Sequence, residues 1–291
     1  IENLYEHIDE MNQSKRKENL INEKDKAFLS RQLAQIDTKA PIEVGVSDTN
    51  YDGRNMEKLI SFYQEMDFKS HLEKLDTTEY MDTLEKDAHE VEYEFVEQIT
   101  ANMFSDTTAI YFEMLDENYH SAPIEAVAWG TDEKVYVTTI DIALASDAFK
   151  TFIQNEDQPK ITYDAKANSV ALKKKGLELK GVEFDVMLAS YLLTSEDSSG
   201  EVLKVTERHG YTGLLPDEAI YGKGKKKAAP EDVERMYNHV ATKVDAIYSL
   251  TDKLKDELAE NEQEELLYDI ELPLAFILGA MEIDGIKVDA N

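Results

Sequence analysis

The sequence predicts an α/β protein with a sheet of mixed direction and flanking helices, preceded by a small helical segment. Two observations support this fold class. Three short runs rich in β-branched and aromatic residues follow one another directly after residue 107. Helical and strand patterns then alternate, before long helical patterns end the chain. Consecutive strands favour antiparallel pairs, whereas strands separated by helices favour parallel pairs, so the predicted sheet is mixed.

The pattern over residues 1–98 predicts helices joined by a linker and a polar connecting segment. Apolar residues recur at helical intervals over 1–40. Proline, glycine and asparagine punctuate 40–50, which predicts a linker. A helix is expected over 55–75. The stretch 76–98 is acidic and only weakly periodic, so we interpret it as a solvated connection.

Five strands and four helices follow in the predicted order. The first three strands come in direct succession, with a polar turn at 131–133 between the second and the third. The predicted strands cover 109–115, 124–129, 134–140, 160–163 and 182–185, and the helices that follow them cover 142–153, 165–175, 186–193 and 202–209.

Two long helices are expected near the end of the chain. Pro230 stands where a first helical turn tolerates the missing N–H, and apolar residues then step by three, four or seven as far as residue 258. A final helix over 262–282 contains Pro273, which predicts a kink. The stretch 286–288 resumes a strand-like pattern, and both ends of the chain look cut.

Charge and composition exclude several classes of protein. The chain has 291 residues and carries 61 Asp and Glu against 31 Lys and Arg, a formal net charge of −30. Such a charge repels the phosphates of nucleic acid and of anionic membranes. The absence of cysteine excludes disulfides, cysteine-based metal sites and a thiol nucleophile. No apolar run approaches the ~18 residues that span a bilayer, so we expect no membrane partner and a cytoplasmic protein.

Several stretches, taken in order, resemble one known family. The central stretches are 160–172, 181–193 and the Gly/Lys loop Tyr221–Lys227, and they resemble the 3′–5′ exonuclease domain of the bacterial DNA polymerase I family (family A). Residues 272–289 are similar to the segment that leads into the polymerase domain of that family, and 18–38 to the tail of its 5′ nuclease domain.

The resemblance implies a division of the chain into four parts. Residues 1–50 would be the C-terminal tail of a 5′ nuclease domain plus a linker, and 51–106 a helical, acidic connecting segment. Residues 107–270 would form a 3′–5′ exonuclease-like domain with an RNase H-like mixed sheet, and 271–291 would start a polymerase domain. DNA would then be bound through a polymerase domain that this chain lacks, on which the exonuclease-like domain would pack.

The resemblance also implies a metal centre that this sequence does not preserve. Active members hold two divalent cations with four carboxylates and a tyrosine, because phosphodiester hydrolysis needs a metal-activated water and a metal on the leaving oxygen. The first motif, Asp-x-Glu, falls on Met114 and Asp116 or, in a second register, on Phe112 and Met114. The second motif places Asn168 at an acidic position. The third, Tyr-x-x-x-Asp, reads His239 and Lys243, which share one helical face.

We therefore expect a vestigial exonuclease domain of the Gram-positive type. The chain itself would have no catalytic residues, metal or cofactor, whereas the parent would be a Mg²⁺-dependent DNA polymerase of replication and repair. Two alternatives remain open. An active exonuclease would use shifted ligands, and an unrelated acidic interaction scaffold would need no such site. The shifted ligands would be Glu113, Asp116, Asp164, which otherwise predicts a helix N-cap, and Asp245.

Overall fold

The computed structural model describes residues 1–37, 39, 41, 45, 49–51, 53–66, 68, 71, 74–75, 88–104, 107–194, 200–222, 224 and 227–287. The chain divides into two units, Ile1–Ser61 and Phe62–Asn291. The domain boundaries expected from the sequence, at 51, 107 and 271, stay predictions.

The first unit consists of short helices with few buried side chains. Tyr5 donates its hydroxyl hydrogen bond to the carbonyl of Leu20, and its ring lies 5.4 Å from that of Phe28. The ion pair between Arg31 and Glu2 joins the ends of the helical segment. The helices expected over 1–40 are present as α1 (Glu2–Glu6), η1 (Ile8–Glu10), α2 (Lys15–Asn22) and α3 (Lys24–Ala34), and α4 (Met56–Glu65) follows.

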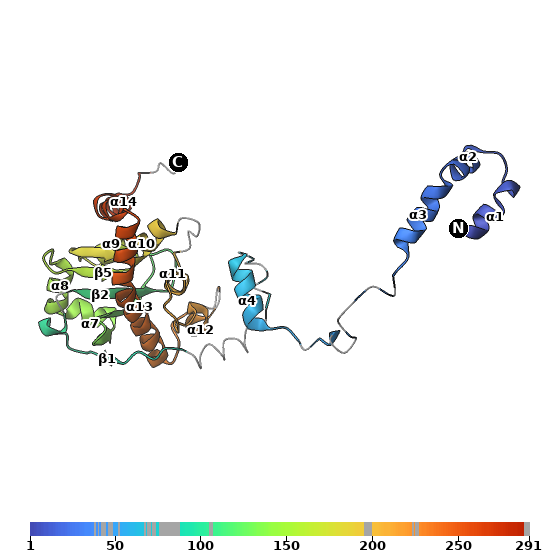
Figure 1. The fold of residues 1–291 in the computed structure, drawn as a ribbon. Coiled ribbons are helices and arrows are strands. Elements are labelled where there is room, and N and C mark those ends of the chain that lie inside the picture. Colours follow the sequence, from blue (N-terminus) through green and yellow to red (C-terminus); the bar gives the residue numbers. More distant parts are fainter. Residues whose placement is uncertain are drawn as a thin grey trace. The chain divides into compact units, whose positions relative to one another are not determined.

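The second unit contains a six-stranded mixed sheet in the order β1-β4-β3-β2-β5-β6 (Figure 1). β2, β3 and β4 pair antiparallel, while β1, β5 and β6 join in parallel. The mixed sheet predicted from the sequence is therefore confirmed. The strands are β1 (Tyr93–Phe95), β2 (Thr108–Met114), β3 (Ile124–Gly130), β4 (Val135–Thr138), β5 (Lys160–Thr162) and β6 (Val182–Asp185).

β1 lies within the stretch interpreted as a solvated connection, and for residues 88–98 that interpretation is wrong. Tyr93–Phe95 pairs in parallel with β4, and Val96 is buried. The acidic residues misled the prediction because Glu94 sits on an edge strand and points to solvent, where it pairs with Lys134. The residues 76–87 lie outside the described part of the chain.

Helices cover both faces of the sheet. The long α13 (Val233–Glu260) packs across β1 to β5 on one face, together with α10 (Val186–Leu193), α11 (Val202–Arg208) and α12 (Asp217–Tyr221). On the other face a second core forms around Trp129, Phe149 and Phe152. That core takes in η3 (Ala101–Met103), α7 (Ile140–Ala145), α8 (Asp147–Gln154) and α9 (Ala165–Lys174).

Two predicted helices differ in detail from the structure. The helix expected over 142–153 is split into α7 and α8, because Ser146 breaks the first helix and caps the second through Phe149 N. The final helix begins with a π-helical turn, η5 (Leu266–Glu271), and continues as α14 (Leu272–Asp284), with Pro273 in its first turn. Residues 286–287 form no strand, and 288 lies outside the described residues.

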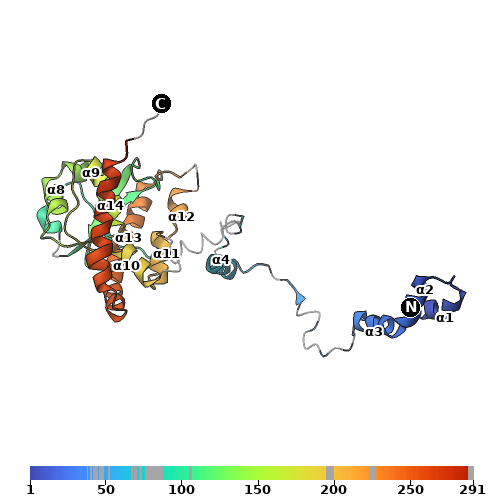
Figure 2. The ribbon, with the colours of Figure 1, turned by 90° about the horizontal axis from the view of Figure 1, so that it is seen from above.

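α14 lies beside α9 at very close range (Figure 2). At Gly279, an added Cβ would stand 2.8 Å from Ser169 Oγ, so any other residue there would require the Ser169 side chain to move. Farther along α14, the carboxylate of Glu282 accepts hydrogen bonds from Lys166 Nζ (2.9 Å) and the Tyr119 hydroxyl (2.7 Å). These contacts fix α14 to the body of the domain.

No helix among the described residues is long and apolar enough to span a membrane.

Candidate functional site

The alternation of side chains along β2 decides which residues reach α13. Tyr111 and Glu113 point toward α13, since side chains two residues apart on a strand share one face. The Lys243 ammonium lies 5.1 Å from the centre of the Tyr111 ring and donates a hydrogen bond to Glu113. Phe112 and Met114 point the opposite way and pack in the core around Trp129. A polar face of β2 therefore meets the long helix, although the strand as a whole is apolar.

α13 presents His239 and Lys243 on the same buried face, as their i,i+4 spacing predicts. The Lys243 side chain is 1% exposed. Its Nζ lies 2.7 Å from Glu113 Oε2 and 2.8 Å from Asp217 Oδ1. His239 Nε2 lies 2.9 Å from the same Asp217 Oδ1. One carboxylate oxygen thus joins two residues of α13.

The short helix α12 completes the site. It supplies Asp217, and one turn later Tyr221, whose ring centre lies 5.8 Å from Lys243 Nζ. The Tyr221 hydroxyl and Glu113 Oε1 are both buried in this site. We call the set the Lys243 cluster; its members are Tyr111, Glu113, Asp217, Tyr221, His239 and Lys243.

The electrostatics of the cluster favour a charged lysine. Burial works to lower the pKa of Lys243, but Glu113 and Asp217 hold it well above the ordinary value. Burial likewise works to raise the pKa of Asp217, but the Lys243 ammonium and the His239 hydrogen bond hold it well below its usual range. Burial and the nearby ammonium lower the pKa of His239, which is therefore neutral at pH 7 and donates through Nε2–H.

The donor set of this cluster does not fit a divalent metal centre. Among the described residues, no group of three His, Asp or Glu side chains is placed to hold a metal ion. Lys243 takes up one oxygen of each carboxylate, and an ammonium at that point repels any incoming cation. The chemistry that this arrangement supports is ion pairing within the fold.

The structure gathers only part of the site expected from the sequence. His239 and Lys243 lie together, whereas Met114 points into the opposite core. Asp116 is exposed beyond the end of β2, where it accepts a hydrogen bond from Asn118 N. Asn168 is buried, and its amide donates to the hydroxyl of Thr162 and to the Tyr163 carbonyl. Neither register considered for the first motif therefore brings its residues to Lys243.

The four shifted ligands of the alternative exonuclease do not gather either. Asp164 caps α9 by accepting from Ala167 N, as predicted for an N-cap. Asp245 lies two residues beyond Lys243 on α13 and accepts from the Tyr211 hydroxyl. Only Glu113 of the four reaches the Lys243 cluster.

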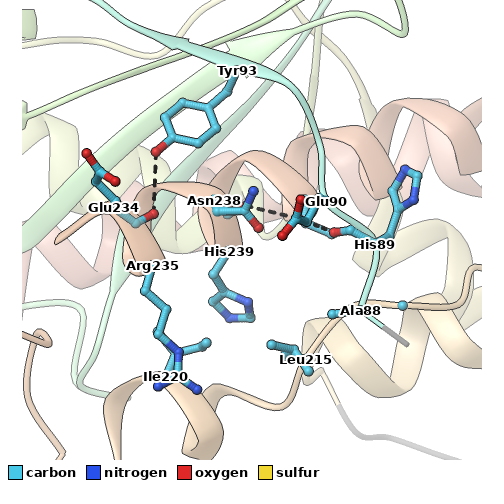
Figure 3. A pocket seen from close by; sticks show the side chains of 12 residues that line it. Ala88, His89, Glu90, Tyr93, Leu215, Ile220, Glu234, Arg235, Asn238 and His239 are labelled. Carbon is cyan, nitrogen blue, oxygen red and sulfur yellow. Dashed lines mark hydrogen bonds between the residues drawn. The ribbon is translucent and has the colours of Figure 1, made fainter. Parts of the chain in front are cut away.

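A pocket of about 440 Å³ lies beside the cluster. The His239 imidazole points into it between Arg235 and Leu215 (Figure 3). Tyr93 forms one wall, where its hydroxyl donates to the Glu234 carbonyl. His239 therefore stands between this pocket and Asp217.

Sequence reasoning missed Tyr111, Asp217 and Tyr221. For Tyr111 a signal existed. Glu113 is the only charged residue in an apolar strand, and a buried charge requires a partner on the facing element. Tyr111 stands two residues before Glu113 and therefore lies on the same face of the strand. Asp217 and Tyr221 lie on a helix of five residues, which is too short to show a helical period.

Comparison with known proteins gives relatives over the whole chain. Residues 110–250 match the family described as DNA polymerase I, ribonuclease H-like domain. The chain is 39% identical over 291 residues to DNA polymerase I of Geobacillus stearothermophilus, covering 100% of this chain and 33% of that protein. It is 41% identical over 288 residues to DNA polymerase I of Streptococcus pneumoniae TIGR4, covering 99% of this chain and 32% of that protein. The chain thus spans about a third of the length of these relatives.

Solved structures share the fold at low sequence identity. Brucella melitensis NrnC aligns with a TM-score of 0.53 and 16% identity, over 69% of this chain and 99% of NrnC. Escherichia coli RNase D, an exoribonuclease involved in structured RNA processing, aligns with a TM-score of 0.51 and 13% identity, over 66% of this chain and 51% of RNase D. Together with the family match, these likenesses confirm the predicted RNase H-like fold.

Proposed function

Because the chain belongs to the bacterial DNA polymerase I family, with residues 110–250 as its ribonuclease H-like domain, we propose that it is part of a DNA polymerase whose exonuclease-like domain is catalytically inactive. The Lys243 ammonium between Glu113 and Asp217 is the observation that carries this proposal. The parent would be a cytoplasmic, Mg²⁺-dependent enzyme that binds DNA through its polymerase domain.

The geometry supports a third register for the Asp-x-Glu motif. Tyr111 and Glu113 are the residues of β2 that face Lys243. In this register the glutamate is kept, the first aspartate is replaced by Tyr111, and Lys243 replaces the aspartate of the third motif. With Asn168 in the second motif, three of the four acidic positions lack a carboxylate. Two-metal hydrolysis needs these ligands to hold both cations.

We expect no metal-dependent shortening of DNA by this chain. The purified chain is incubated with 3′-labelled single-stranded DNA and Mg²⁺ or Mn²⁺, and products are resolved on a sequencing gel. The Glu113→Gln variant serves as the matched control, because it removes the one acidic ligand that the motif retains. Shortening that EDTA abolishes and that Glu113→Gln also loses would disprove the proposal.

We further propose that the domain is a platform for the polymerase domain, docked through α14. One side of α14 is fixed by Gly279 and Glu282, whereas the other carries a row of apolar side chains between 39% and 63% exposed. Such a row is expected where a protein surface is covered by another domain. The row consists of Leu274, Ile277, Leu278 and Met281, and Ile270 of the preceding η5 is exposed as well.

Charged substitutions in this row test the platform. Ile277→Glu and Met281→Glu are expected to change the melting temperature of this chain little, because both side chains are more than half exposed. In the longer polypeptide, burial of the new carboxylate is expected to lower the melting temperature by about 5 °C or more. Calorimetry of both proteins, with each variant, makes the comparison. Equal effects in the two proteins would contradict the platform.

A further inference from the structure

We propose that the Lys243 cluster is a binding site for an ammonium-type cation, and that the side chain of Lys243 is its resident occupant. The inference rests on the proposed function in one respect: the same residues are taken not to hold a divalent metal. It adds a ligand class, a primary ammonium ion, to a site that does not fit a divalent metal.

The groups around Lys243 Nζ are those that select an ammonium ion. Glu113 and Asp217 accept hydrogen bonds from it at 2.7 and 2.8 Å, and they come from two different elements, β2 and α12. The rings of Tyr111 and Tyr221 lie 5.1 and 5.8 Å from the same nitrogen. Aromatic faces attract organic cations through the ring quadrupole, and carboxylates accept the N–H groups.

Without the Lys243 ammonium, the site carries a net negative charge and would attract a cation. Two carboxylates face one ammonium, and His239 is neutral because burial and the ammonium lower its pKa. Glu113 Oε1 and the Tyr221 hydroxyl are buried as well, so further polar atoms lie in the same space. Removing the lysine side chain would leave two negative charges around a cavity that its methylene groups and nitrogen had filled.

A divalent cation is a poor substitute in this site. Mg²⁺ requires six oxygen ligands in near-octahedral geometry and gives up its waters reluctantly. The cluster offers two carboxylates, and its other members are two tyrosines and an imidazole whose Nε2 already bonds Asp217. The pocket beside the cluster reaches His239 (Figure 3), and His239 Nε2 in turn bonds Asp217.

Chemical rescue tests the inference. Lys243→Ala is expected to lower the melting temperature by about 10 °C, because it leaves the buried Glu113 and the partly exposed Asp217 without their counter-charge. Ethylammonium chloride is expected to restore about 5 °C at a concentration 100-fold above its dissociation constant. Tetramethylammonium and sodium chloride at equal ionic strength are expected to restore less than 1 °C, since neither can donate hydrogen bonds to the carboxylates. The wild-type chain, whose site is filled, is expected to show no difference among the three salts.

Two further variants keep the test decisive. Lys255→Ala is the matched control, because Lys255 lies on the same helix and pairs with Glu183 at 2.7 Å, yet both side chains are partly exposed. It is expected to show no response specific to ethylammonium. If Lys243→Ala does not fold in buffer, it is refolded from urea with and without ethylammonium. The fraction of protein that refolds is then compared in place of the melting temperature. The double variant Glu113→Gln/Lys243→Ala is expected to fold with a smaller ethylammonium response.

The possible outcomes separate this inference from the proposed function. Rescue by ethylammonium alone supports the ammonium site. Equal stabilisation by all salts, or none by any, overturns it, and stronger stabilisation of Lys243→Ala by Mn²⁺ overturns it as well. None of these results depends on exonuclease activity of the wild-type chain, which the labelled DNA assay measures separately.

Discussion

Replacing Lys243 with methionine is expected to lower the free energy of unfolding by about 3–5 kcal/mol. The variant keeps an unbranched side chain, one atom shorter, but removes the counter-charge of Glu113, whose side chain is 1% exposed. Asp217, at 33% exposed, loses its closest cation as well. Removing one partner of a buried ion pair costs more than the pair itself contributes, because the remaining charge stays desolvated. Urea denaturation followed by circular dichroism measures the change.

The matched control and a double variant distinguish this cause from a general loss of packing. Lys255→Met removes an ion pair of the same 2.7 Å length, but one that solvent screens, and is expected to cost less than about 1 kcal/mol. Glu113→Gln in the Lys243→Met background is expected to recover much of the loss, because the buried charge is then gone. If Lys243→Met costs no more than Lys255→Met, the buried ion pair is not what holds α12 and β2 to α13.

The second large effect is expected at Asp185, at the end of β6. Its side chain is fully buried and accepts backbone hydrogen bonds from the starts of two helices. Asp164 N and Ala165 N donate to it at the beginning of α9, and Met187 N and Leu188 N in the first turn of α10. Asp185→Ala leaves these N–H groups without partners and is expected to cost roughly 4 kcal/mol or more.

A pH series compares the wild type with Asp185→Asn, which keeps one acceptor oxygen and is expected to cost less than Asp185→Ala. Burial raises the pKa of Asp185 to about 6, against 3.8 in an unfolded chain. Between these values the folded protein binds a proton that the unfolded chain does not bind. The free energy of unfolding of the wild type relative to Asp185→Asn is therefore expected to fall as the pH rises from about 4 to about 6. A flat difference over this range would contradict the assignment.

Much of the fold was predictable because its signals are local. The runs that became β2, β3 and β4 combine β-branched and aromatic residues with short polar turns, and the apolar spacing of α13 continues for most of its 28 residues. β1 was missed because three residues in an acidic stretch carry no recognisable period, and its pairing with β4 depends on the rest of the sheet. The break between α7 and α8 was missed because the apolar period runs on through Ser146.

The site was predictable only where it depends on one helix. The spacing of His239 and Lys243 places both on one face of α13 whatever surrounds it. The register of β2 depends instead on which face α13 covers, and that is a property of the whole sheet. A register irregularity between Glu113 and Met114 adds to the difficulty, since it shifts the end of the strand relative to β3. The role of Asp217 depends on where α12 docks, which no local pattern indicates.

Unfolding of the sheet domain can be followed by the fluorescence of Trp129. It is the only tryptophan of the chain, fully buried on β3, and its indole stacks on Phe104 and Tyr136 while Nε1 donates to the Met103 carbonyl. Its emission is therefore expected to lie at short wavelength and to resist quenching by iodide until the sheet opens. Because the first unit has no tryptophan, this emission reports the unfolding of the sheet domain and leaves events in the N-terminal helices silent.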